Sequence, residues 1–168
     1  FSTVRGANTA GFLVCSALIA FALYAQQVLG LEPCPLCIFQ RVAVICLGLL
    51  FLVAAVHAAG RGMRRGYAIL IGLTALAGSG VAGRQLWLQA LPPDRVPACG
   101  PGLDFMLEAF PVGEMLMTVL SGSGECAKVD WVLLGLSMPG WVLIALVVLG
   151  TYGVVLNWRG RGWSVRTR

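Results

Sequence analysis

The chain has 168 residues, of which 58% are hydrophobic and only 11% are charged. This composition excludes an ordinary soluble globular protein and places the chain in the membrane class, with the lipid bilayer around it. The net charge of +5 comes from arginines at the ends of apolar segments, so it does not indicate a nucleic-acid partner, and we expect none.

Four stretches without charged side chains are long enough to cross the hydrocarbon core, which takes roughly 20 apolar residues in a helix. We predict helices at about residues 9–29, 38–59, 67–89 and 131–158, the last with a kink or an offset start at Pro139-Gly140. The short connections favour antiparallel neighbours. The predicted fold is an all-α membrane protein, an up-down bundle of four transmembrane helices that forms a single integral membrane domain over residues 1–168.

Arginines mark one end of this bundle. They precede the first helix, fill the turn between the second and third helices and follow the fourth, at Arg5, Arg61, Arg64, Arg65, Arg159, Arg161, Arg166 and Arg168. The positive-inside rule places this end in the cytoplasm, and all seven acidic residues fall on the other side. We therefore expect both termini to be cytoplasmic and the outer loops, at about residues 30–37 and 90–130, to lie on the opposite side.

The second outer loop is the long extramembrane segment. Its parts Leu103–Phe110 and Met115–Leu120 are too apolar for a solvated loop and too short to span. We expect a short interfacial helical segment that lies flat on the bilayer surface. The following Ser121–Gly124 is either a flexible hinge or only a turn.

Four cysteines fall at the outer side. Cys34 and Cys37 are separated by two residues before the second helix, and Cys99 and Cys126 lie in the second outer loop. Two-residue spacing is typical of redox-active dithiols, although two static structural bridges also suit an oxidising compartment. A zinc site is disfavoured, because only one cysteine pair is close and the single histidine, His57, lies near the other end of its helix. We predict no metal.

Arg41 lies one helical turn after Cys37 on the same face. Its guanidinium could merely snorkel toward the headgroups. We favour a functional role, in which it promotes a thiolate at Cys37 and donates hydrogen bonds to a carbonyl oxygen of a bound quinone. Arg84 is more ambiguous and is more often a snorkelling anchor. Four thiols beside a bilayer suggest electron transfer from a water-soluble thiol protein to a lipid-soluble acceptor.

Two strings carry a family resemblance. Glu32–Arg41 (EPCPLCIFQR) resembles the first loop of the disulfide bond formation protein B family, DsbB. Gly124–Ala127, followed by Trp131 and Leu134–Trp141, looks like that family's entry into its last helix. The resemblance extends over about residues 9–158.

This resemblance implies a bacterial inner-membrane protein-disulfide:quinone oxidoreductase. Such an enzyme reoxidises a periplasmic DsbA-like thiol oxidase and passes two electrons to ubiquinone, or to menaquinone; we expect a monomer. By position, Cys99 matches the cysteine that the partner attacks, and Cys126 matches the one that exchanges with Cys34. Cys37 matches the cysteine that faces the quinone, and Arg41 matches the arginine beside it.

Gln85 stands about where some family members have a histidine, so any proton or hydrogen-bond role of that histidine is in doubt for this chain. Two alternatives stay open. A vitamin K epoxide reductase-like enzyme also joins paired cysteines to a quinone, but that family places its close pair near a later helix. A non-catalytic membrane adaptor with two structural disulfides would resist mild reductant and would bind no quinone.

Overall fold

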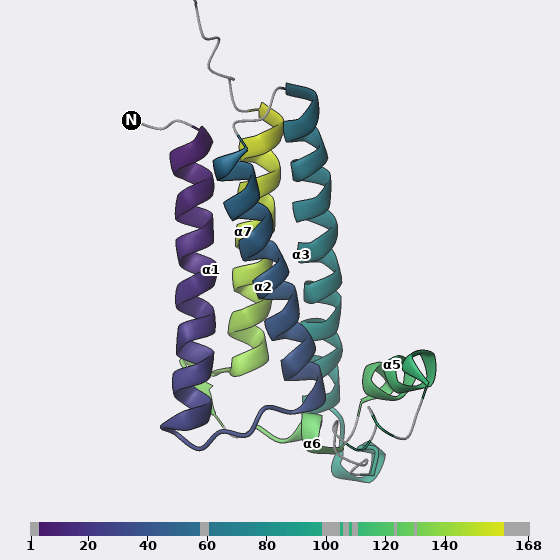
Figure 1. Cartoon of the computed structure of the whole chain (residues 1–168). Helices are drawn as coiled ribbons and strands as arrows, with labels where there is room; N and C mark the ends of the chain where they lie inside the picture. Colours follow the sequence, from purple (N-terminus) through teal and green to yellow (C-terminus); the bar gives the residue numbers. More distant parts are fainter. Residues whose placement is uncertain are drawn as a thin grey trace, which may run out of the picture.

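The computed structural model describes residues 4–57, 61–98, 105, 108, 111–122, 124–129 and 131–159. Its four long helices are α1 (Val4–Gln27), α2 (Pro35–Val56), α3 (Arg61–Gln89) and α7 (Met138–Arg159). Each is long and apolar enough to cross a membrane. Successive long helices run in opposite directions along one bundle (Figure 1). The predicted all-α, four-helix membrane fold is therefore confirmed.

The first three helices begin at residues 4, 35 and 61 rather than at the predicted 9, 38 and 67. Apolar composition marks only the part of a helix that matches the hydrocarbon core, whereas the backbone hydrogen bonds continue into the polar ends of the span. α1 ends at Gln27, ahead of Gly30, whose φ of +66° directs the chain out of the helical conformation.

The fourth helix differs most from its prediction. It begins at Met138, and a small antiparallel hairpin of β1 (Val132–Leu133) and β2 (Leu136–Ser137) replaces the predicted first turns. The two residues at its tip, Leu134 and Gly135, have φ values of +53° and +81°, as a type I′ turn requires. The sequence does not indicate this turn, because the first of these positions is a leucine rather than the Asn, Asp or Gly that is typical of type I′ turns. The fourth helix therefore has the predicted offset start near Pro139-Gly140. The prediction of a helix from residue 131 was wrong.

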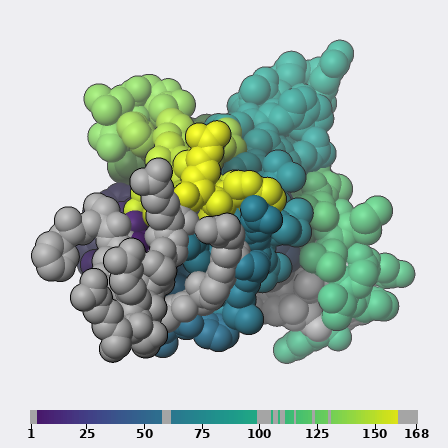
Figure 2. Space-filling view, turned by 90° about the horizontal axis from the view of Figure 1, so that it is seen from above, coloured from purple at the N-terminus to yellow at the C-terminus, as the bar shows by residue number. Residues whose placement is uncertain are grey.

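Among the described residues, three further short elements lie at the outer end of the bundle, where α2 begins and α3 ends. They are η1 (Pro93–Arg95), α5 (Val112–Ser121) and α6 (Gly124–Ala127). α5 lies to one side of the bundle (Figure 1), and a view along the bundle shows α5 and the segment around the hairpin projecting on different sides (Figure 2). Of the predicted Leu103–Phe110 segment, only Phe105 and Glu108 belong to the described residues.

Among the side chains of α5 that the structure describes, one apolar group is buried and several are exposed. Val119 is buried, whereas Val112, Leu116, Met117 and Leu120 are exposed, Met117 by 73%. An exposed apolar face on a short helix beside a transmembrane bundle suits a position at the membrane surface. The interfacial location itself remains a prediction.

The four long helices pack mainly in chain order, with α2 also packed on α3. α1 packs on α2, and α7 packs on α3, while α1 and α7 make few contacts with each other. A reciprocal amide pair joins α1 to α7 at the arginine-rich end. Asn8 Nδ2 donates to Asn157 Oδ1 at 3.2 Å, and Asn157 Nδ2 donates to Asn8 Oδ1 at 3.0 Å. Both side chains are at most 1% exposed, so each amide depends on the other for an interhelical partner.

We predict that the Asn8–Asn157 pair stabilises the bundle as a unit. Asn8→Leu or Asn157→Leu should lower resistance to unfolding in detergent titrated with SDS, because each leaves a buried amide without its partner across the helices. The double variant should lose less than the sum of the two, with a coupling energy of about 0.6–1.7 kcal/mol. Strictly additive losses would contradict a direct interaction.

We also predict that α5 is anchored by its apolar face. Leu116→Glu combined with Met117→Glu should detach the helix from the bilayer surface, because burying charge there is costly. Thr118→Glu is the control, since position 118 shares a face with Glu114. Spin labels on α5 should move from lipid to water contact only in the double variant. Water exposure of the unmodified helix would show the prediction to be wrong.

Candidate active site

The Cys34–Cys37 dithiol lies at the first turn of α2. Cys34 is the N-cap residue, and its Sγ accepts a hydrogen bond from the backbone N–H of Cys37 at 3.4 Å. Pro35 lies at the start of the helix, where its fixed φ suits the helical conformation. Its missing N–H costs no hydrogen bond, because an N–H at this position has no acceptor within the helix. Cys37 therefore belongs to the helix rather than to the predicted loop. The two sulfurs are 2.8 Å apart, and both cysteines are free.

A third cysteine reaches this pair from the second outer loop. Cys126, in α6, is 1% exposed and belongs to a small apolar core at this end of the bundle. Its hydrogen bond with Cys34, the bond between Cys34 and Cys37, and burial together raise the pKa of Cys34 above its ordinary value. The structure brings Cys34, Cys37 and Cys126 together, whereas Cys99 lies outside the described residues.

The turn between α5 and α6 returns Cys126 to the bundle. Gly122 has a φ of +84°, and a Cβ at this position would overlap Cδ1 of Leu88, so the chain can cross α3 here only with glycine. Gly122 and Gly124 are both buried, and the Gly124 N–H donates to the Ala98 carbonyl at 3.2 Å. These contacts favour a packed turn over a flexible hinge for the described part of residues 121–124.

Arg84 holds the end of α5 against α3. Its Nε and Nη2 donate to the carbonyl oxygens of Leu120 and Ser121 at 3.3 and 2.9 Å, which belong to the last helical turn and lack partners within the helix. The guanidinium also lies 4.2 Å from the centre of the Trp87 ring. Arg84 therefore caps the C-terminal end of a neighbouring helix. Sequence reasoning missed it because the carbonyls are more than 30 positions away.

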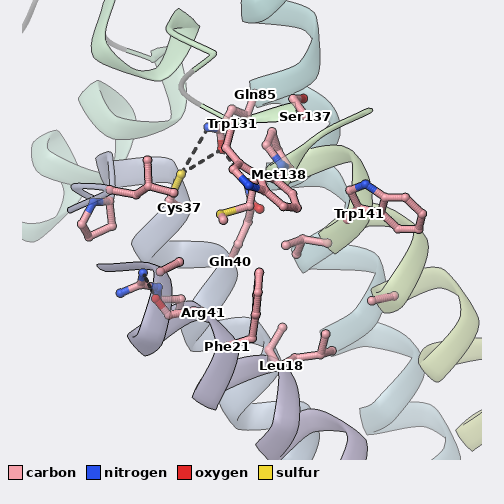
Figure 3. Close-up of a pocket in the computed structure, with 18 of the residues that line it drawn as sticks. Leu18, Phe21, Cys37, Gln40, Arg41, Gln85, Trp131, Ser137, Met138 and Trp141 are labelled. Carbon is pink, nitrogen blue, oxygen red and sulfur yellow. Dashed lines mark hydrogen bonds between the residues drawn. The ribbon is translucent and has the colours of Figure 1, made fainter. Parts of the chain in front are cut away.

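Two buried glutamines stand behind the dithiol. The family resemblance had singled out the position of Gln85 without assigning it a role, and Gln40 had not been singled out. Gln85 Nε2 lies 3.3 Å from the Sγ atoms of both Cys34 and Cys37. Gln40 Nε2 donates to Gln85 Oε1 at 2.7 Å. Each glutamine is 3% exposed. Figure 3 shows the Gln85 amide directed at Cys37. The sequence signal that could have found them is a polar glutamine within each apolar helix, and Gln40 lies three positions after Cys37.

A cavity of about 450 Å³ opens beside Cys37. Side chains of α1, α2, α7 and the hairpin form a mostly apolar wall, and the polar groups that reach it include Cys37, Gln40, Arg41 and Gln85 (Figure 3). Ile144 and Val148 of α7 line the cavity and are also 43% and 59% exposed on the outside of the bundle. The cavity therefore reaches the lipid-facing surface on the side where α1 and α7 make few contacts.

Arg41 lies on the cavity wall but is held by α1. Its Nη1 donates to Gln26 Oε1 at 2.5 Å, and its Nη2 donates to the Ala22 carbonyl at 3.1 Å. Within the described residues, neither sulfur of the dithiol is a hydrogen-bond partner of this guanidinium. The side-chain donor that faces both sulfurs is the Gln85 amide.

Gln89 connects α3 to the segment that covers the outer end of the cavity. Ser137 Oγ donates to Gln89 Oε1 at 2.7 Å, and Gln89 Nε2 donates to the Lys128 carbonyl at 3.3 Å. The Trp141 indole N–H then joins α7 to the hairpin through the Leu133 carbonyl at 3.1 Å. These bonds hold the hairpin over the cavity beside the dithiol.

Comparisons with known proteins agree with this geometry. The family model described as "Disulfide bond formation protein DsbB" matches residues 4–156. The chain is 53% identical over 148 residues to disulfide bond formation protein B of Methylococcus capsulatus, which covers 88% of this chain and 90% of that protein. It is 54% identical over 136 residues to the protein of the same name from Hahella chejuensis, covering 81% and 82%.

A third relative, disulfide bond formation protein B of Nitrosococcus oceani, is 52% identical over 148 residues, or 88% of each chain. The matches span all four long helices and both strings that carried the resemblance. They favour a disulfide-forming oxidoreductase over the vitamin K epoxide reductase-like and adaptor alternatives. On its fold, its thiol site and these relatives, the chain belongs to the DsbB family of disulfide bond formation proteins.

Proposed function

We propose that this disulfide-forming membrane oxidoreductase reoxidises a periplasmic DsbA-like thiol oxidase and passes the two electrons to a membrane quinone, ubiquinone or menaquinone. The observation that carries the proposal is the position of the Cys34–Cys37 dithiol. On one side, Cys34 meets Cys126 of the second outer loop. On the other side, Cys37 lines an apolar cavity that reaches the lipid-facing surface.

The thiol half of the reaction uses four exchanges. A partner thiolate attacks Cys99 of a Cys99–Cys126 disulfide, and the second partner thiol resolves the mixed disulfide, which leaves the partner oxidised and the loop pair reduced. The Cys126 thiolate then attacks Cys34 of the Cys34–Cys37 disulfide, and the electron pair of the broken bond leaves on Cys37. Cys99 finally displaces Cys34 from Cys126, so that the loop disulfide forms again. Contact between Cys34 and Cys126 supports the third exchange, in which Cys126 attacks Cys34.

The residues around the cavity fit a quinone. A volume of about 450 Å³ is within the range of small-molecule sites, and its mostly apolar wall suits a hydrophobic ring. A bound quinone supplies an acceptor for two electrons and two protons. Cys37 would face it, and Arg41 would donate to a carbonyl oxygen, because a guanidinium has five N–H donors and, among the described residues, two hydrogen bonds hold this one on α1.

The charge distribution supports an orientation in a bacterial inner membrane. Arg5, Arg64, Arg65 and Arg159 lie near the end of the bundle where α1 begins and α7 ends, opposite the dithiol. Basic residues favour the cytoplasmic side, so the dithiol end faces the periplasm. We retain a monomer in this proposal, because one chain supplies the dithiol, Cys126 and the cavity wall.

We expect Arg41→Met to weaken quinone use while leaving the loop pair intact. The substitution keeps length and apolar character but removes the charge and the donors. The KM for a soluble quinone analogue should rise about tenfold or more, in line with the loss of one charge-assisted hydrogen bond. Arg65→Met, at the opposite end of the bundle, is the matched control. Unchanged quinone kinetics in Arg41→Met would show that Arg41 does not contribute to quinone binding and only snorkels toward the headgroups.

We expect cysteine substitutions to trap the exchange at defined bonds. A partner whose second cysteine is replaced cannot release itself from Cys99, so a partner–Cys99 disulfide should accumulate with that partner. Cys126→Ser should abolish this species, because it leaves no Cys99–Cys126 disulfide for the partner thiolate to attack. Cys37→Ser removes the close partner of Cys34, so a Cys34–Cys126 bridge should form between the loops. Non-reducing electrophoresis with mass mapping distinguishes these species. A partner trapped on Cys34, with the second loop untouched, would reverse the assigned order.

A further inference from the structure

The Gln40–Gln85 pair forms a chain of hydrogen bonds that ends on the dithiol. Gln40 extends from the second turn of α2 and Gln85 from the last turns of α3. The bond between them is 2.7 Å long, and Gln85 Nε2 is 3.3 Å from each sulfur. Both side chains also line the cavity. The pair thus stands at the boundary between the dithiol and the cavity.

Gln40 determines which end of the Gln85 amide faces the sulfurs. A carboxamide has a donor end and an acceptor end. Because Gln40 donates to the Gln85 oxygen, the Gln85 NH₂ group is left to face Cys34 and Cys37. The longer contact of 3.6 Å from Cys37 Sγ to Gln85 Oε1 engages the same oxygen that Gln40 already occupies.

An N–H donor beside a sulfur interacts more strongly with the reduced pair than with the disulfide. When the disulfide opens, an electron pair moves onto a sulfur, and a hydrogen bond to that thiolate is stronger than one to a neutral disulfide sulfur. A donor fixed at this place therefore stabilises the reduced pair more than the oxidised pair. Stabilising the reduced form makes a disulfide a stronger oxidant.

We propose that Gln85 and Gln40 are positioning residues that raise the reduction potential of the Cys34–Cys37 pair: Gln85 donates to the sulfur that receives the electrons, and Gln40 fixes the orientation of that amide. The inference rests on the proposed redox role of the pair. When Cys126 attacks Cys34, the Cys34–Cys37 bond breaks, its electron pair stays on Cys37, and Gln85 donates a hydrogen bond without transferring its proton.

A purely structural role predicts something different. Two buried amides between α2 and α3 could serve only to join the helices, and their loss would then lower stability by the modest amount typical of interhelical hydrogen bonds in membranes. Such a role would leave the potential of the dithiol unchanged. The potential, rather than stability, therefore separates the two roles.

The test is a double-mutant cycle on the full-length protein. Gln85→Met, Gln40→Met and the double variant are equilibrated with glutathione buffers, and the Cys34–Cys37 peptides are quantified by differential alkylation and mass spectrometry. Gln27→Met is the control, because Gln27 is exposed at the end of α1. Gln85→Leu provides the same test if Gln85→Met does not accumulate in the membrane.

We expect Gln85→Met to lower the equilibrium constant for reduction of the pair by glutathione about tenfold, or about 30 mV. Gln40→Met should lower it about threefold, and the double variant should match Gln85→Met, because Gln40 acts through Gln85. Equal potentials in the wild type and Gln85→Met would overturn the inference, and additive effects would overturn the role of Gln40. A wild-type pair that glutathione cannot reduce would overturn the proposed redox function itself.

Discussion

The site depends on where α2 begins. A proline at the first helical position and a cysteine as N-cap fix the start of this helix at the outer end of the bundle. Once the start is fixed, the helical repeat places Cys37 in the first turn and Gln40 and Arg41 in the next. Cys37 also lies beside the partial positive charge of the helix N-terminus, which favours an anion. One short sequence thus sets the depth, orientation and electrostatic surroundings of the dithiol together.

The second loop reaches this site through contacts made by α3. Arg84 holds the last turn of α5, and Leu88 packs where Gly122 lets the chain cross. The following residues then return as α6 and bury Cys126 beside Cys34. α3 therefore presents three kinds of group to the outer end within a few residues: a cap for α5, a surface for the turn and, through Gln85, a donor to the sulfurs. The thiol exchange proposed above requires this convergence of two distant loops.

Apolar composition predicted the four spans because a helix is the simple way to satisfy the backbone in lipid. The spacing of Cys34 and Cys37, with Arg41 one turn later, indicated the dithiol and a residue of the cavity wall. Other features could not be predicted in this way. The hairpin at residues 132–137 has the composition of a helix, and only the positive φ of Leu134 and Gly135 reveals it. The Gln40–Gln85 bond and the Arg84 cap join residues far apart in the chain, and a single sequence contains no sign of such distant pairs.

The cavity beside the dithiol opens toward the side of the bundle where α1 and α7 make few contacts. α1 and α7 are tied by their asparagines at one end of the bundle and make few contacts elsewhere, while Ile144 and Val148 belong both to the cavity and to the outer surface. Under the proposed function, the quinone would therefore enter and leave sideways, without crossing water. Its hydrocarbon tail can remain among the acyl chains while only its head group is recognised. Occupancy then follows the amount of acceptor per lipid rather than its concentration in water, and exchange is diffusion in two dimensions.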